Sequence, residues 1–321
     1  MTEFEDLKVY IAGHTGLMGS ALIRRLARLG TVRIIKATRG ELDLTDSKAV
    51  ECFLQQVRPD IVIIAAGKVG GILANSLYPV EYIHENIMIE TNLIHSAWKT
   101  GVKRLLNFGS ACMYPKHCRQ PMSPDLLMTG KLEPTSEPYA IAKLAGLCLC
   151  SSYNRQYRTS YITAIPCNLY GPDDTFDPTS AHLIPALIQK FYRARADREK
   201  KVVLWGDGSA KREFLHVDDL ADACLAVMQN LEFKDVGELI NVGTGKDKRI
   251  SEIAELVRET AGFDGSIRFD PSKPDGTPRK LMDVGKLTGL GWTHKISFEE
   301  GLRRTFEWYT ASREPQRHPA S

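Results

Sequence analysis

The sequence predicts an α/β fold, a doubly wound parallel sheet with helices on both faces. Three observations predict this class. Short apolar runs alternate with longer amphipathic stretches through the first half of the chain. Residues 61–65 are apolar throughout, which is typical of a strand buried on both faces. A glycine-rich turn at residues 13–19 follows the first apolar run and opens the first amphipathic stretch, as in nucleotide-binding folds of this class.

The elements of the sheet follow in regular order. Residues 8–12 predict the first strand, and residues 17–29, with their apolar side chains on one face, predict the first helix. The other strands are expected at residues 32–37, 61–65, 104–108 and 161–165. The other helices are expected at residues 46–57, 81–99 and 139–157. This alternation predicts parallel pairing with helical crossovers.

After residue 171 the alternation changes, which indicates a smaller C-terminal α/β domain. The expected elements are a loop at 172–180, a charged helix end or loop at 193–201, a strand at 239–242, a helix at 250–261, a loop at 271–278 and a polar tail at 312–321. We expect a nucleotide-binding domain over residues 1–171, with a return segment near 212–243. Residues 172–321 are expected to form mainly a substrate-binding domain.

Composition excludes several classes of protein. The 42 basic and 39 acidic residues nearly balance, so we expect no nucleic-acid partner. No apolar run approaches the roughly 20 residues of a membrane-spanning helix, so we expect no membrane partner. The first seven residues include three acidic ones and predict no secretory signal. The seven cysteines form no CxxC pair and no metal-ligand spacing, which predicts a reduced, cytoplasmic protein without a metal.

The glycine turn has the spacing G-x-x-G-x-x-G. Gly13 permits a tight turn, Gly16 lets a pyrophosphate approach the backbone, and Gly19 allows the helix to pack closely on the strand. The start of the helix then supplies free N–H groups and the positive end of its dipole. The turn therefore predicts a dinucleotide site, although a plain strand-to-helix turn has the same outline. The candidate residues are Gly13, His14, Thr15, Gly16, Leu17, Met18 and Gly19.

The end of the second expected strand indicates which nicotinamide cofactor binds. An acidic residue is usual there when the ribose 2′-OH of NAD is held. This chain has Arg39 instead, and a guanidinium suits the 2′-phosphate of NADP. We therefore expect NADP(H), the alternative being an ordinary surface arginine. Asp43 and Leu44 are expected to reach the adenine.

Three residues predict carbonyl reduction. Tyr139 and Lys143 are four residues apart, so both lie on one face of the expected helix. The ammonium is expected to lower the pKa of the phenol, which then exchanges a proton with a carbonyl oxygen. Ser110 follows the strand at 104–108, at the edge of a parallel sheet where ligands bind. Its hydroxyl would polarise the same carbonyl.

These motifs resemble those of the GDP-L-fucose synthase family of extended short-chain dehydrogenases/reductases, which have a Rossmann-type fold. The segments that resemble this family are His14 and residues 66–72, 110–115, 137–143, 168–172, 212–219 and 273–280. The resemblance extends from about Lys8 to Tyr309. It implies that the chain is an NADP-dependent oxidoreductase with epimerase activity.

The resemblance implies two reactions in one pocket. GDP-4-keto-6-deoxy-D-mannose is epimerised at C3 and C5, with Cys112 as base and His182 as acid, and NADPH then reduces C4 to give GDP-L-fucose. A thiolate and an imidazole are suited to these roles near neutral pH. Considered without the resemblance, Cys112 is a small buried apolar residue and His182 a satisfied loop or core histidine.

The resemblance also implies further binding residues. For the cofactor they are Lys143, Pro166, Asn168, Leu169 and His182. For the GDP-sugar they are Lys190, Trp205, Arg212, Asp275 and Lys280. Lys190 and Arg212 suit a diphosphate, whereas the alternatives are core packing for Trp205 and a plain salt bridge for Arg212.

Three positions depart from the family pattern. Thr15 stands where members often have an arginine that makes a second contact to the 2′-phosphate, which predicts a weaker preference for NADP. Ala111 replaces a serine, and Cys167 replaces a threonine close to the nicotinamide. Neither Ala111 nor Cys167 removes a proposed proton-transfer group.

Alternatives remain at this stage. The same residues would serve another GDP-4-keto-deoxy sugar, such as a 6-deoxyheptose or a 3,6-dideoxy sugar. A non-catalytic NADP-binding scaffold, or an RNA-binding protein on the same fold, is a reading of another class. The resemblance further implies a homodimer formed through helices 81–99 and 139–157, whose apolar faces would otherwise belong entirely to the core.

Overall fold

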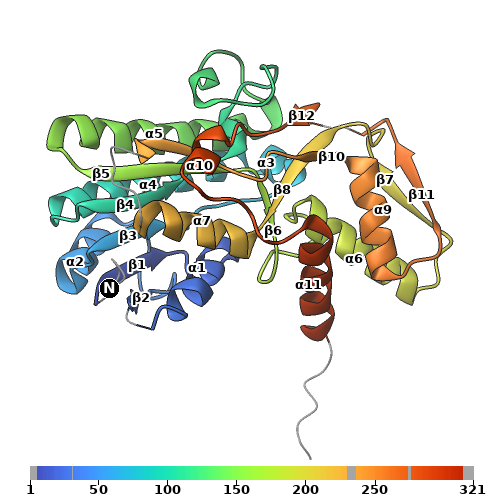
Figure 1. Ribbon diagram of the computed structural model, residues 1–321, viewed down its shortest axis with the longest axis horizontal. Helices are drawn as coiled ribbons and strands as arrows, with labels where there is room; N and C mark the ends of the chain where they lie inside the picture. The colour runs from blue at the N-terminus through green and yellow to red at the C-terminus, as the bar shows by residue number, and fades with distance from the viewer. Residues whose placement is uncertain (1–5, 31, 230–235, 274–275, 314–321) are drawn as a thin grey trace, which may run out of the picture.

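The computed structural model describes residues 6–30, 32–229, 236–273 and 276–313. Its main sheet has six parallel strands in the order β2-β1-β3-β4-β5-β9 (Figure 1). These strands are β1 (Lys8–Ala12), β2 (Arg33–Ile35), β3 (Ile61–Ile64), β4 (Arg104–Phe108), β5 (Ser160–Pro166) and β9 (Leu239–Val242). The predicted parallel sheet is confirmed, with β2 shorter than the run 32–37 because only three residues pair with β1.

Helices cover both faces of the sheet, so the fold is doubly wound as predicted (Figure 1). One face carries α1 (Leu17–Ala27) and α7 (Val217–Gln229). The other carries α2 (Ser47–Val57), α4 (Pro79–Lys99) and α5 (Glu137–Tyr157). The helix α4 begins two residues earlier than predicted, because a proline in the first turn of a helix has no N–H to leave unpaired.

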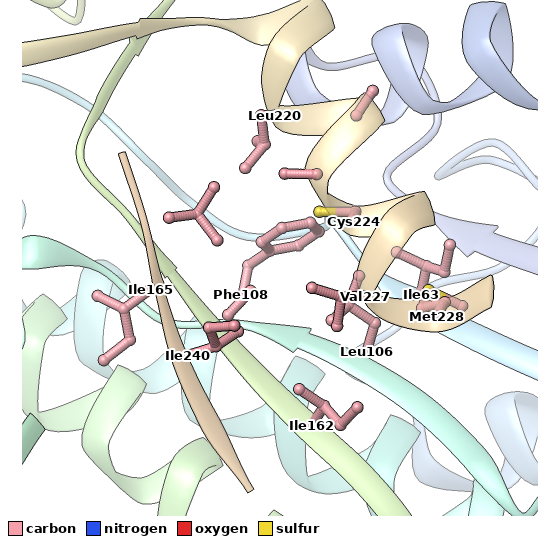
Figure 2. Packing of buried hydrophobic residues seen from close by; sticks show 14 of the residues in the cluster. Ile63, Leu106, Phe108, Ile162, Ile165, Leu220, Cys224, Val227, Met228 and Ile240 are labelled. Carbon is pink, nitrogen blue, oxygen red and sulfur yellow. The ribbon is translucent and has the colours of Figure 1, made fainter. Parts of the chain in front are cut away.

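The core on one face of the main sheet is formed by apolar side chains of α7 and of the strands beneath it. Leu220, Cys224 and Val227 of α7 point at the sheet, where Phe108 of β4 and Ile240 of β9 meet them (Figure 2). Cys224 is 1% exposed, and burial raises the pKa of its thiol. This cysteine is therefore a packing residue.

The remaining strands and helices form a second, smaller system of sheets and helices. Its strands are β6 (Asn168–Tyr170), β7 (Lys201–Trp205), β8 (Lys211–His216), β10 (Asp247–Arg249), β11 (Ser266–Asp270) and β12 (Arg279–Lys280). Its helices are α6 (Leu183–Ala196), α9 (Ile250–Ala261) and α11 (Phe298–Ala311), with short α10 (Gly285–Gly289) beside β9. The strand β8 pairs with β6, β10 and β12, and β7 pairs with β11.

This second system has its own hydrophobic cluster, formed by α6, α9 and α11 with β7 and β8. The chain returns to the first sheet through α7 and β9. The division into 1–171 and 172–321 stays a prediction, and within the return segment expected near 212–243 it is α7 and β9 that join the first sheet, whereas β8 belongs to the second system. Within the described ranges, none of the helices combines the length and apolar character that crossing a membrane requires.

Strand order fixes where a ligand binds. The connection after β1 leads to β2 on one side, whereas the connection after β3 leads to β4 on the other, so their first turns separate at the carboxyl ends of these two neighbouring strands. Gly13 follows β1 there, and Ala65 and Ala66 follow β3. The residues that end β4 and β5 lie along the same edge. Loops from four parallel strands therefore meet at one edge of the sheet.

Candidate active site

The glycine turn has no room for a Cβ at two of its positions, Gly13 and Gly19. Gly13 has φ +79°, and a Cβ there would lie 2.6 Å from the backbone N of Ala66. A Cβ on Gly19 would lie 2.2 Å from the carbonyl oxygen of Gly13. The turn between β1 and α1 is thus pressed against the end of β3.

The first turn of α1 is open to an anion. Gly16 is its N-cap and supplies no side-chain cap, and the first turn contains no acidic residue. The first N–H groups of a helix have no partner within the helix, and its dipole places positive charge there. These residues fit the diphosphate of a dinucleotide, and Gly13, His14, Thr15, Gly16, Leu17, Met18 and Gly19 are the residues that would hold it.

Arg39 and the loop after it lie beside this turn. The Arg39 side chain is 83% exposed, with Nη2 3.9 Å from a carboxylate oxygen of Glu85. The pKa of Glu41 is lowered by hydrogen bonds from Thr38, with a smaller contribution from the charge of His14 in the glycine turn. Asp43 accepts hydrogen bonds from the backbone N–H and hydroxyl of Thr45.

These contacts differ between Asp43, Leu44 and Arg39, the three residues predicted to bind the cofactor here. The Asp43 carboxylate is used in its own turn, and the Leu44 carbonyl accepts a hydrogen bond from Asn92. Both interactions shape the loop, and the expected contact of Asp43 and Leu44 with the adenine stays a prediction. Arg39 extends into solvent and leaves its guanidinium accessible to a phosphate.

Ser110 joins the catalytic candidates. It stands at the end of β4 and caps the short 3-10 helix η1 (Ala111–Met113), accepting a hydrogen bond from the backbone N–H of Cys112 at 3.2 Å. Its hydroxyl also lies near the side chains of Cys112 and Tyr139 and favours the charged form of each, acting to lower both pKa values. One serine thus links the candidate base for epimerisation to the candidate acid for reduction.

Tyr139 and Lys143 lie on the buried side of α5, as their spacing predicts. The Lys143 ammonium is 5.9 Å from the centre of the Tyr139 ring. It also forms an ion pair with Glu90, whose carboxylate oxygen is 2.6 Å away. Tyr139 packs edge-on against Tyr82 of α4. Each of these contacts holds the phenol in place against the Ser110 hydroxyl.

The Lys143 ammonium acts to lower the pKa of Tyr139, as expected, but the net shift is upward. Burial raises the pKa of Tyr139 and outweighs the opposing effect of the Lys143 ammonium. Glu90 adds to the raised pKa, because its negative charge offsets that of Lys143. Tyr139 is therefore a protonated phenol at neutral pH, which is the form that donates a proton.

Sequence reasoning missed Glu90. Its side chain is 1% exposed and lies on the face of α4 that packs on α5. Gly146 of α5 makes room for it, because a Cβ there would lie 1.5 Å from Oε2 of Glu90. The signal was a lone acid on the apolar face of the expected helix, since a buried charge requires a partner of opposite charge.

Cys112 faces a lysine from the other end of the chain. The Lys280 ammonium on β12 is 3.4 Å from its sulfur. Burial disfavours the thiolate, but the charge of Lys280 and hydrogen bonds from Ser110, Ser136 and Lys280 together outweigh burial, and the pKa of Cys112 is lowered. The structure thus places Lys280, predicted from the resemblance to bind substrate, against the thiol.

His182 reaches the same neighbourhood from the start of α6, where it is the N-cap residue. The preceding loop is held against Gly71, whose N–H donates to the carbonyl of Ser180. A Cβ on Gly71 would lie 2.8 Å from the carbonyl oxygen of Ala181, so only glycine allows this approach. Desolvation lowers the pKa of His182, and the Lys280 ammonium lowers it further.

The remaining cofactor candidates extend from the end of β5. Pro166 is its last residue, and Asn168 and Leu169 begin β6. The Asn168 amide donates a hydrogen bond to the carbonyl of Glu213 at 2.9 Å, which ties β6 to β8. Between them Cys167 is buried, and burial raises the pKa of its thiol.

The substrate candidates are divided between two places. Arg212 of β8 lies opposite Lys280 of β12 in register, close to Cys112. Lys190 of α6 donates to the carbonyl of Val203 on β7, and desolvation lowers its pKa. Trp205 ends β7 with 48% of its surface exposed. Asp275 lies outside the described residues.

Across the residues that the structure describes, no group of three or more His, Cys, Asp or Glu side chains is arranged to hold a metal ion.

Comparison with known proteins places this arrangement among relatives. The model of the NAD dependent epimerase/dehydratase family matches residues 9–243. A putative GDP-L-fucose synthase 2 from Arabidopsis thaliana is 51% identical over 95% of this chain and 92% of its own length. GDP-L-fucose synthase from Escherichia coli is 50% identical over 94% and 96%, respectively. A GDP-mannoheptose C4 reductase from Campylobacter jejuni with NADP bound superposes with a TM-score of 0.88 at 38% identity, covering 95% of this chain and 98% of that one.

Proposed function

Because the chain belongs to the NAD dependent epimerase/dehydratase family, we propose that it acts as a GDP-L-fucose synthase. It takes GDP-4-keto-6-deoxy-D-mannose, inverts C3 and C5, and reduces C4 with NADPH to give GDP-L-fucose. About half of its residues are identical to those of enzymes with this name over nearly their whole length. The fold and the glycine turn fit the NADP(H) that such a reduction requires.

The reduction needs an acid at the C4 oxygen. NADPH bound at the glycine turn supplies hydride to C4. Ser110 and Tyr139 would both hydrogen-bond the C4 oxygen, and the protonated phenol would donate its proton as negative charge develops there. Lys143 lies within 5.9 Å of the ring and favours the phenolate that remains.

The epimerisations need a base and an acid on opposite faces of the sugar. The C4 ketone acidifies the protons on C3 and C5. The Cys112 thiolate removes a proton, the electron pair of the broken C–H bond moves to the C4 oxygen, and Ser110 and Tyr139 stabilise this enolate. His182 returns a proton to the carbon from the other face. Cys112 then loses the proton it gained and His182 regains one from solvent, after which the same steps at the second carbon complete the inversion.

A single observation favours this function most: Ser110 lies beside both Cys112, whose backbone N–H donates to its hydroxyl, and Tyr139. A ketone oxygen at Ser110 would therefore have a base for its neighbouring carbons and an acid for itself. The test is incubation with NADPH and GDP-4-keto-6-deoxy-D-mannose in deuterated water, followed by NMR of the product. Deuterium at both C3 and C5 of a fucosyl product supports the proposal, whereas reduction without exchange contradicts it.

A second substrate class has a specific observation in its favour. The GDP-mannoheptose C4 reductase shares the fold over 95% of this chain. A GDP-4-keto-6-deoxyheptose, or a 3,6-dideoxy sugar, would meet the same Ser110 and Tyr139. Comparison of kcat/KM for the hexose and the heptose decides between them, since the proposal requires the hexose to be preferred. The non-catalytic scaffold is disfavoured by the proximity of Ser110, Tyr139 and Cys112.

We place the enzyme in the cytoplasm as a homodimer, with a GDP-sugar as its partner and neither nucleic acid nor membrane. Reduced cysteines agree with this compartment, because all seven cysteines are free. The helices α4 and α5 would form the dimer. Trp98 and Tyr157 stack on their outer side with ring centres 4.3 Å apart, and Tyr157 is 39% exposed. Light scattering at micromolar concentration tests this, and a monomeric mass would contradict it.

A further inference from the structure

The contact between Lys280 and Cys112 is not explained by substrate binding. The ammonium is 3.4 Å from the sulfur, although the two residues are 168 positions apart. A lysine that only bound a diphosphate would have no reason to face a thiol. An ammonium at this distance stabilises the thiolate over the thiol.

Both members of the pair are held by the backbone around them. The segment after Lys280 is fixed by hydrogen bonds from the Leu281 N–H to Gln120 at 2.9 Å and from the Met282 N–H to Glu213 at 2.6 Å. On the other side, the Cys112 N–H is capped by Ser110. The two groups are therefore preorganised, and the contact costs little further ordering of either segment.

Glu213 strengthens this positioning. It is fully buried, and besides Met282 its carboxylate accepts hydrogen bonds from the backbone N–H groups of Thr244 and Gly245. One side chain thus ties β8 to the loop after β9 and to the segment that carries Lys280. Arg279, next to Lys280, forms an ion pair with Asp247 of β10.

The other titratable groups around Cys112 do not supply the positive charge that Lys280 supplies to the thiolate. They are Tyr82 on α4, Tyr139 and Lys143 on α5, and His182 at the start of α6. The two phenols are neutral because burial raises the pKa of each. The Lys143 ammonium is neutralised by Glu90. Desolvation and Lys280 lower the pKa of His182, so the imidazolium is its minor form at pH 7.

We propose that Lys280 is a positioning residue that holds Cys112 as a thiolate, ready to remove the C3 and C5 protons. When the thiolate takes a proton, the S–H bond forms, the C–H bond breaks and its electron pair moves to the C4 oxygen. Lys280 keeps its own protons throughout. The effect of Lys280 on catalysis rests on the proposed function. Its effect on the ionisation of the Cys112 thiol in the resting enzyme does not.

The test compares Lys280→Met, which removes the charge and keeps much of the stem, with Lys280→Arg, which keeps the charge. Full-length enzyme is treated with iodoacetamide across a pH series, and labelling is quantified on the tryptic peptide of residues 105–116, which contains Cys112 as its one cysteine. We expect an alkylation midpoint below the usual thiol range in the wild type. In Lys280→Met it should rise by about one to three pH units, and in Lys280→Arg it should stay close to the wild type.

A second measurement needs no change at position 280. Thiolate absorbance near 240 nm is titrated in wild type and in Cys112→Ser, and the difference gives the Cys112 curve directly. The proposal is overturned if this curve has the midpoint of an ordinary thiol. It is also overturned if the alkylation midpoint does not move in Lys280→Met. A substrate-binding role predicts instead a higher KM for the GDP-sugar with an unmoved midpoint.

Deuterium exchange distinguishes the two proposals. In Lys280→Met we expect exchange into substrate without NADPH to fall about tenfold per unit of midpoint shift at pH 7, and to recover as the pH rises past the new midpoint. If the wild type shows no exchange while the midpoint still shifts, the proposed function fails and the Lys280–Cys112 pair stands.

Discussion

The ion pair between Glu90 and Lys143 makes a prediction about both stability and chemistry. Their side chains are 1% and 4% exposed, and the two charged atoms are 2.6 Å apart. Water does not screen such a pair. Glu90→Gln keeps the volume but removes the charge, so it leaves an unpaired ammonium in the core. We expect the free energy of unfolding at pH 7 to fall by about 3–5 kcal/mol.

The assay is urea unfolding followed by tryptophan fluorescence, with a matched surface control. Glu51→Gln removes a carboxylate that is 26% exposed and pairs with Lys99, which is 50% exposed. This change should lower the free energy of unfolding by only about 0.2–1 kcal/mol. The double variant Glu90→Gln/Lys143→Met removes both buried charges. It should recover most of the loss, because no uncompensated charge then remains.

Two results would refute this reasoning. One is a loss in Glu90→Gln no larger than in Glu51→Gln. The other is a double variant that is less stable than Glu90→Gln alone. The dependence on pH has a defined sign as well. Burial disfavours the Lys143 ammonium, but Glu90 outweighs burial and raises the pKa of Lys143. The stabilisation that Lys143 contributes is therefore complete at neutral pH and is lost only as the pH rises through that raised pKa.

Four further substitutions test the site. Tyr139→Phe should lower reduction at least 100-fold while deuterium exchange continues, and loss of both activities would contradict separate roles. Cys112→Ser should do the reverse, with exchange lost at C3 and C5; exchange at the wild-type rate would rule out the thiol as base. Arg39→Ala should reduce the preference for NADPH over NADH about tenfold, measured as a ratio of kcat/KM values, because one charged contact to the 2′-phosphate is lost. Gly19→Ala places a Cβ 2.2 Å from the Gly13 carbonyl oxygen, and it should abolish NADPH binding in calorimetry or unfold the chain; unchanged affinity would place the cofactor elsewhere.

The parts of this fold that could be predicted from sequence are local. Alternating periodicity gave the strands of the main sheet, because burial on one or two faces leaves a pattern within a few residues. The glycine turn could be recognised because a positive φ and a close helix–strand contact demand glycine at fixed spacing. Tyr139 and Lys143 shared a face because a helix repeats at that interval.

What could not be predicted depends on residues far apart in the chain. Glu90 meets Lys143 across 53 positions, and Cys112 meets Lys280 across 168. Contacts between residues so far apart produce no periodic pattern of residue types that a single sequence would reveal. The effect of Lys143 on the pKa of Tyr139 was predicted correctly, but the net upward shift was not, because it depends on burial and on Glu90. Lys280 was recognised as a site residue by resemblance, but its partner is given only by the packing of β12.

These two lysines explain how one pocket supports opposite proton transfers. Burial keeps Tyr139 protonated, and the Lys143 ammonium, which is paired with Glu90, does not outweigh it. Lys280 faces a thiol instead, so its charge lowers the pKa of Cys112. When the environments of two titratable groups push their pKa values apart, one group becomes the acid and the other the base. Ser110 lies beside both groups, so a single ketone bound there meets a base beside its carbons and an acid beside its oxygen. The balance between burial and the neighbouring lysine therefore decides which chemistry each group performs: burial prevails at Tyr139, whereas Lys280 and hydrogen bonds prevail at Cys112.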